Sequence, residues 1–105
     1  MSKVMEQQRY LTRGIANKIE PLIQLYLWEL IDERKNKGEE VDYFQIFDLS
    51  VETQDGKAMQ KIVHRQEEPE YSCVHYLNCI SKPITCKIWV IDSSEYWTML
   101  FPEEY

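Results

Sequence analysis

The chain of 105 residues lies near the commonest size of a single domain, so one hydrophobic core is expected. Hydrophobic residues make up 44% of it, with 3 Trp, 7 Tyr and 3 Phe, which argues against a disordered chain. With 18 acidic and 12 basic side chains the formal net charge is -6, which disfavours direct nucleic-acid binding and favours a protein partner with a basic surface.

The N-terminal region lacks the features of a targeting segment. Residues 1–20 include Lys3, Glu6, Arg9 and Arg13 and contain no apolar run of signal-peptide length. No later stretch approaches the roughly 20 apolar residues of a membrane-spanning helix. We therefore expect a cytoplasmic protein without membrane contact, whose residues 1–8 are flexible because they show no hydrophobic period.

Residues 10–15 and 21–36 are the first two predicted elements. The run from Tyr10 to Ile15 favours β-structure and predicts a short strand. Pro21 suits the first turn of a helix, where its missing N–H costs nothing, and Gly38 marks the helix end. A helix is therefore predicted over residues 21–36.

The chain from Val41 onward has the pattern of β-structure. The predicted strands cover residues 43–52, 58–66, 71–79, 84–91 and 96–101. Turn signals such as Asp55-Gly56 and Lys82-Pro83 separate them, and connections this short predict a meander of hairpins. The predicted fold class is α+β: one N-terminal amphipathic helix packed on one face of an antiparallel sheet of five to six strands, in a single domain over residues 1–105.

Symmetric pairing of the strands about their turns sorts the side chains onto two faces, because side chains alternate with a period of two. The mainly polar face is expected to be solvated. The apolar face is expected to form the core, and its members are Phe47, Leu49, Val51, Ile62, Leu77, Ile84, Cys86, Ile88, Val90, Trp97, Met99 and Phe101.

The predicted helix has more apolar surface than the sheet requires. Its core arc consists of Ile23, Tyr26, Leu27, Leu30 and Ile31. A second ridge consists of Leu22, Leu25 and Trp28, interspersed with Glu29 and Asp32. This ridge predicts a contact surface for a protein partner or, in a homodimer, for a second copy. The alternative is that the N-terminal strand or tail folds over it.

Aromatic and apolar residues also occur on the polar face of the sheet, near Lys61, Arg65 and Lys87; they are Ile46, Val74, Tyr76, Trp89 and Tyr96. Aromatic side chains among basic ones are typical of sheets that stack nucleic-acid bases, so an RNA- or DNA-binding module is one alternative. The acidic total charge opposes it. We expect a protein-binding patch around Tyr76, Trp89 and Tyr96 instead.

The cysteines and histidines raise the alternative of a small metal-binding protein. Cys73 and Cys79 share a predicted strand with His75, and His64 is predicted to lie directly across the hairpin from His75. Structural zinc normally uses close ligand pairs on tight turns, which the spacing of Cys73, Cys79 and Cys86 does not provide. We expect reduced cysteines in a core, with no metal, no cofactor and no catalytic residue.

Three carboxylates flank Pro69 on a predicted hairpin loop. Glu67, Glu68 and Glu70 have no apolar wall there that would raise a carboxyl pKa, so they are expected to form a solvated turn rather than a catalytic pair. Like Glu29, Asp32 and Glu33 of the helix, they are candidate contacts for a basic partner.

Several segments together resemble a known bacterial family. They are YLTRGIANKI at 10–19, LWELIDE at 27–33, QKIVHRQEEPEYS at 60–72, KIWVIDSSEYWTML at 87–100 and the closing PEEY. The chain resembles the uncharacterised Gram-positive family catalogued as domain of unknown function nine hundred and sixty. The resemblance implies a genomic setting in staphylococci, enterococci and streptococci, often on mobile elements and phages, and implies no activity or ligand residues.

The expected function is that of a non-enzymatic protein-interaction protein. Its concrete form is an acidic inhibitor that covers the basic channel of a host nucleic-acid-handling enzyme, as an anti-CRISPR protein does with a CRISPR nuclease. The candidate partner-binding residues are Leu22, Leu25, Trp28, Glu29, Asp32, Tyr76, Trp89, Tyr96, Glu67, Glu68 and Glu70.

Overall fold

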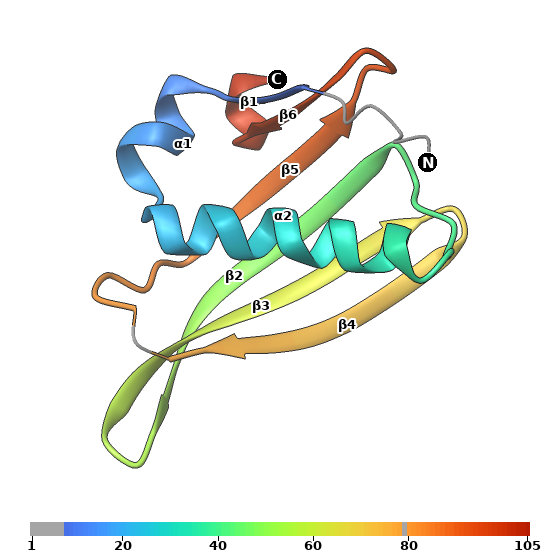
Figure 1. Cartoon of the computed structure of the whole chain (residues 1–105). Coiled ribbons are helices and arrows are strands. Elements are labelled where there is room, and N and C mark those ends of the chain that lie inside the picture. Colours follow the sequence, from blue (N-terminus) through green and yellow to red (C-terminus); the bar gives the residue numbers. More distant parts are fainter. Residues whose placement is uncertain (1–7, 79) are drawn as a thin grey trace, which may run out of the picture.

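The computed structural model describes residues 8–78 and 80–105, in which a mixed β-sheet is covered on one face by helices (Figure 1). The helices are α1 (Arg13–Lys18) and α2 (Pro21–Asn36), followed near the C-terminus by a 3-10 turn, η1 (Pro102–Glu104). The strands are β1 (Gln8–Leu11), β2 (Phe44–Gln54), β3 (Lys57–Glu67), β4 (Glu70–Leu77), β5 (Cys86–Asp92) and β6 (Tyr96–Leu100). Neither α1 nor α2 has the length and apolar character needed to cross a membrane.

The strands are arranged in the order β1-β6-β5-β2-β3-β4. β1 runs parallel to β6, and every other neighbouring pair is antiparallel. After β4 the chain crosses over to β5, which pairs with β2 in the middle of the sheet. β4 and β1 therefore lie at the two edges of the sheet that the described residues form (Figure 1).

The predicted fold class is wrong. The first described element is a strand rather than a helix, two α-helices are present in the described part, and the parallel pair of β1 and β6 makes the sheet mixed. The meander is wrong because β5 pairs with β2 and not with β4. The physical reason is burial: Ile88 and Val90 of β5 are fully buried and need neighbours on both sides, whereas residues of β4 alternate between exposed and half-buried.

The predicted strand over residues 10–15 is correct only as far as Leu11. Residues from Arg13 form α1, because Thr12 caps the helix by accepting a hydrogen bond from Ile15 N at 3.3 Å. Ile15 and Ile19, one turn apart, both insert into the core. Core packing thus overrides their β-propensity. Residues 1–7, predicted to be flexible, lie outside the described residues, and Gln8 begins β1.

The prediction of a helix over residues 21–36 is confirmed by α2, which starts at Pro21 and ends at Asn36. Ile23, Leu27 and Ile31 of α2 are fully buried in the core cluster. The predicted core face of the sheet is largely confirmed as well. Val51 is the exception, being 43% exposed, because the β2–β3 hairpin extends away from α2 and no helix of the described residues covers it there (Figure 1).

Two buried glutamines of β3 attach the connecting segments to the sheet. Gln60 accepts a hydrogen bond from Ile84 N at 2.8 Å and donates to Ile84 O at 2.9 Å, so it holds the segment that leads into β5. Gln66 accepts from Asp42 N at 3.0 Å and donates to Glu40 O at 3.1 Å, so it holds the segment that leads from α2 to β2. Both side-chain amides act as extra peptide groups inside the core.

The C-terminal turn is attached to the start of α1 through one carboxylate. Glu104 accepts hydrogen bonds from Thr12 Oγ1 at 2.6 Å, Phe101 N at 2.9 Å and Gly14 N at 3.2 Å. A side chain at position 14 would collide with it, since a Cβ built on Gly14 would lie 2.5 Å from Glu104 Oε2. These bonds, with that of Thr12 first, lower the pKa of the Glu104 carboxyl.

Replacing Glu104 should therefore destabilise the protein in a pH-dependent way. Because the folded-state pKa is below the ordinary Glu value, the stabilisation is complete above that value and is lost as pH falls through the folded-state pKa. Glu104→Gln should lower the melting temperature at pH 7, and the difference from wild type should shrink on acidification. Glu103→Gln, at an exposed neighbouring carboxylate, is the control, and an equal effect of both variants would contradict the assignment.

Candidate functional site

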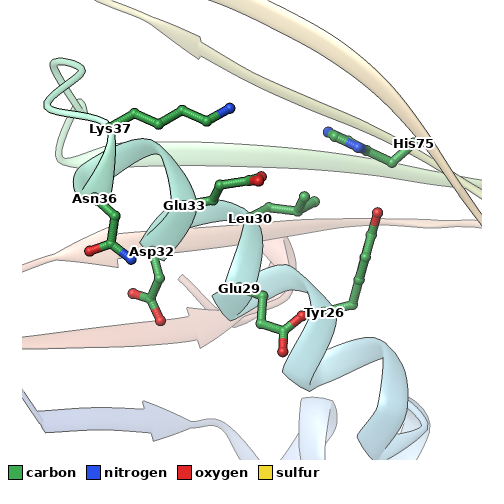
Figure 2. Close-up of a pocket in the computed structure, with 8 residues that line it drawn as sticks. All are labelled: Tyr26, Glu29, Leu30, Asp32, Glu33, Asn36, Lys37 and His75. Atoms are coloured by element: carbon green, nitrogen blue, oxygen red, sulfur yellow. The ribbon is translucent and has the colours of Figure 1, made fainter.

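An open groove of about 540 Å³ runs between α2 and β4 (Figure 2). Its lining consists of Tyr26, Glu29, Leu30, Asp32, Glu33, Asn36, Lys37 and His75. All but His75 come from α2 and the residue after it, so one side of the helix forms one wall and β4 forms the other. In Figure 2, Tyr26, Glu33 and Lys37 extend from the helix towards the side on which His75 lies.

Contacts at both ends of the groove place α2 beside β4. The Arg34 guanidinium lies 3.5 Å from the ring centroid of Tyr71, at the start of β4. The Tyr26 ring lies 6.1 Å from the ring of His75, towards the end of β4. The helix and the strand therefore run in opposite directions along the groove (Figure 1).

The helix wall of the groove is acidic. Glu29 and Glu33 are exposed, one turn apart, and neither makes an ion pair within the described residues. Asp32 differs because it pairs with Arg9 of β1. Burial, together with the charges of Glu33 and Glu29, raises the pKa of the Tyr26 hydroxyl. Lys37 is the one basic side chain that lines the groove among the described residues.

His75 is a neutral polar group on the opposite wall at pH 7. Burial lowers its pKa, and the nearby charge of Glu33 offsets only part of that effect. Its Nε2 atom is buried and has no hydrogen-bond partner within the described residues. The groove thus combines two unpaired carboxylates with an imidazole that carries no charge to balance them.

The predicted ridge of the helix is partly exposed. Leu22 and Leu25 are exposed, Leu25 to 60%, as a contact surface requires. The prediction that Trp28 is exposed is wrong: it is only 9% exposed, and the Arg9 guanidinium of β1 covers its ring at 4.8 Å from the centroid. The alternative that the N-terminal strand folds over this ridge is confirmed for Trp28.

The aromatic residues of the other sheet face do not form one patch. Trp89 is half-buried between Phe44 and Tyr105, at ring distances of 4.9 and 5.8 Å. Tyr96 lies beside Tyr10 on β6 and β1, at 5.2 Å. Tyr76 lies on β4, three strands away from Trp89, which is roughly 14 Å at the usual strand spacing.

The basic residues of that face are already paired. Lys61 pairs with Glu52 at 3.9 Å, while Arg65 and Lys87 both pair with Asp48, at 2.8 and 3.7 Å. A phosphate backbone would have to displace these carboxylates. The face therefore offers a nucleic acid less positive charge than the sequence indicated.

Glu67, Glu68 and Glu70 are exposed at the turn between β3 and β4, as expected. The backbone N–H of Glu68 donates to Asp42 Oδ2 at 3.2 Å, which ties this turn to the segment after α2. Glu70 begins β4 and lies on the face of the sheet away from α2, so it does not line the groove.

The predicted pairing of the two histidines is wrong by two residues. His64 lies opposite Cys73, and His75 lies opposite Ile62, because the turn is centred between Glu68 and Pro69. A shift of two residues keeps both histidines on the core face. Cys79 lies outside the described residues, and within those that are described no three His, Cys, Asp or Glu side chains are placed to hold a metal ion.

His64 belongs to a buried polar layer. Gln45 donates both of its amide hydrogens, to Gln66 Oε1 at 2.8 Å and to Asp42 O at 2.9 Å. Its Oε1 atom therefore accepts from His64 Nε2 at 2.6 Å, so the His64 proton resides on Nε2. The His64 Nδ1 atom is buried without a partner in the described structure. Burial, with smaller effects of Arg34 and His75, lowers the pKa of His64 to about 3.

We predict that His64 stays neutral far below pH 6.5. The unfolded chain takes up a proton on this residue between about pH 6.5 and 3, whereas the folded protein does not, so stability should fall as pH drops through that window. Imidazole nitrogen NMR shifts should show the Nε2–H form at pH 5.

The variant His64→Leu isolates the contribution of His64 to the stability of the protein and to its pH dependence. At pH 7 it should be less stable by about 1–3 kcal/mol, because Gln45 Oε1 loses its donor. Between pH 7 and pH 4 it should lose less stability than wild type. Titration of His64 near its ordinary pKa in the folded protein would contradict this interpretation.

The importance of β4 could not be inferred from the predicted meander, which placed this strand inside the sheet. One sequence signal does exist. Glu29 and Glu33 are like charges at a spacing of four, which slightly destabilises a helix, and Lys37, four residues after Glu33, is the one basic residue at that spacing on the same side.

Comparisons with known proteins identify the family and the fold. No curated protein matches the chain significantly. Among solved structures, a crystal structure of a protein of unknown function from Enterococcus faecalis is similar, with a TM-score of 0.73 and 22% identity over 94% of this chain and 91% of that one. This likeness supports the fold. The family model described as staphylococcal protein of unknown function (DUF960) matches residues 8–104, so the chain belongs to that family.

Proposed function

We propose that the protein is a non-enzymatic interaction protein that binds a basic protein partner along the groove between α2 and β4. The observation that carries this proposal is the pair of unpaired carboxylates, Glu29 and Glu33, on the wall of an open groove. Each is exposed and close enough to its neighbour to repel it. Lysine or arginine side chains of a partner would relieve this repulsion.

The charge of the whole chain supports the same partner. A net charge of -6 attracts a basic surface over long range and speeds the encounter. Exposed Leu22 and Leu25 lie on the same helix and add apolar contact area beside the acidic groove. A nuclease or another enzyme with a basic nucleic-acid channel has the complementary chemistry, and covering that channel would inhibit it.

Charge reversal in the groove should separate a specific partner from nonspecific binding. Wild type, Glu29→Lys/Glu33→Lys and Glu95→Lys/Glu103→Lys are each used for affinity capture from staphylococcal and enterococcal lysates, with captured proteins identified by mass spectrometry. The control pair changes the net charge equally at exposed sites away from α2. A basic protein should be retained by wild type and the control and lost by the groove variant.

Binding and activity are then measured with the purified partner. The groove variant should bind about tenfold more weakly, as the loss of two surface charge pairs implies, while the control changes little. If the partner is a nuclease, its cleavage should be slowed by wild type and the control only. A partner that binds all three proteins alike, or no captured partner, would refute the proposal.

A further inference from the structure

β4 is an open strand edge beside the acidic groove. It pairs with β3 on one side, and no other strand of the described chain lies on its other side. In an antiparallel pair every second residue directs its N–H and C=O away from the partner strand, so β4 presents a row of unpaired backbone groups. Such a row is a template for one more strand.

β4 lacks the devices that normally protect an edge. Its eight residues contain no lysine and no proline, and its pairing with β3 runs without interruption from Glu70 to Leu77. Val74 and Tyr76 are exposed on the face away from α2. An added strand could cover both through cross-strand contacts.

The spacing of the carboxylates matches an extended chain. Glu29 and Glu33 are four residues apart, which is about 6 Å along a helix axis. Side chains on one face of a strand are two residues apart, which is roughly 6.6 Å. Since α2 runs alongside β4, two alternate side chains of an added strand can each meet one carboxylate.

The charges favour a foreign strand over a second copy of this chain. Pairing of β4 with β4 of another copy would bring two α2 helices to the same side, with Glu29 and Glu33 of each facing those of the other. Four carboxylates would then lie close together, with one Lys37 side chain from each copy to offset them. A basic segment would instead place positive charges beside Glu29 and Glu33 and neutralise them.

We propose that β4 accepts an extended segment of the partner as an additional strand, with Lys or Arg at two alternate positions facing α2 and apolar residues between them. This rests on the proposed function and specifies how the partner is recognised. Backbone hydrogen bonds to β4 supply part of the affinity, and Glu29 and Glu33 select the basic side chains. Val74 and Tyr76 select the apolar residues that point to the other face.

A peptide library tests this mode without knowledge of the natural partner. Random linear decapeptides with blocked ends are displayed and selected on the intact protein. Enriched peptides should carry Lys or Arg at positions i and i+2 with an apolar residue between them. Their dissociation constants should rise about tenfold for Glu29→Lys/Glu33→Lys, as the loss of two charge pairs implies, and stay unchanged for Glu95→Lys/Glu103→Lys.

Backbone pairing is tested on an enriched peptide by N-methylation of one amide at a time. Because only every second amide of an added strand faces β4, losses of affinity should recur with a period of two. Hydrogen exchange of the amides of residues 70–77 should slow when the peptide is bound. The proposal would be overturned if no such peptide were enriched, or if the N-methylation scan showed no period of two. It would also be overturned if hydrogen exchange in β4 did not change when the peptide is bound.

Two further outcomes distinguish this inference from the proposed function. A natural partner that depends on Glu29 and Glu33 but leaves exchange in β4 unchanged would preserve the interaction function and refute strand addition. A peptide-free dimer that protects β4, seen by light scattering and hydrogen exchange, would refute it in favour of a second copy of the chain.

Discussion

The side-chain amides of Gln60 and Gln66, near the two ends of β3, hold the connections that determine the topology. Gln60 pairs with both backbone groups of Ile84, so the chain that leaves β4 is held against β3 before it enters β5. Gln66 makes four hydrogen bonds, two of them to Asp42 and Glu40 in the segment that leaves α2. With both connections anchored on β3, β5 is directed to β2, and β4 is left at the edge beside α2.

The polar layer around His64 gives this arrangement a defined geometry. Apolar packing alone allows a helix to slide on a sheet, because hydrophobic contact is not directional. Arg34 of α2 donates to Glu40 O at 3.1 Å and stacks on Tyr71, while His64 stacks on Phe47 at 4.4 Å and donates to Gln45. Each of these contacts requires one particular geometry. Together they fix the position of the Glu33 side of α2 relative to β4.

Local patterns in the sequence predicted the elements better than their arrangement. Pro21 and Gly38 delimit α2 through backbone geometry, and the period of two assigned Phe47, Leu49 and Ile62 to the core even where a strand register was wrong by two residues. The crossover from β4 to β5 depends on contacts distant in sequence, such as Gln60 with Ile84, which no local pattern encodes. The acidic residues of the candidate site were therefore identified before the groove that gives them a role.

An open strand edge must avoid pairing with the wrong chain and still remain available to the right one. The carboxylates of α2 serve both requirements. An unprotected β4 would pair with any extended chain, including another copy of the same protein, and natural sheets usually prevent this with charges at the edge. Glu29 and Glu33 place those charges on the helix above the strand, so the backbone of β4 remains available while acidic chains are repelled. Discrimination against the wrong strand and affinity for a basic one then come from the same two side chains, which is how a small interface achieves specificity with few contacts.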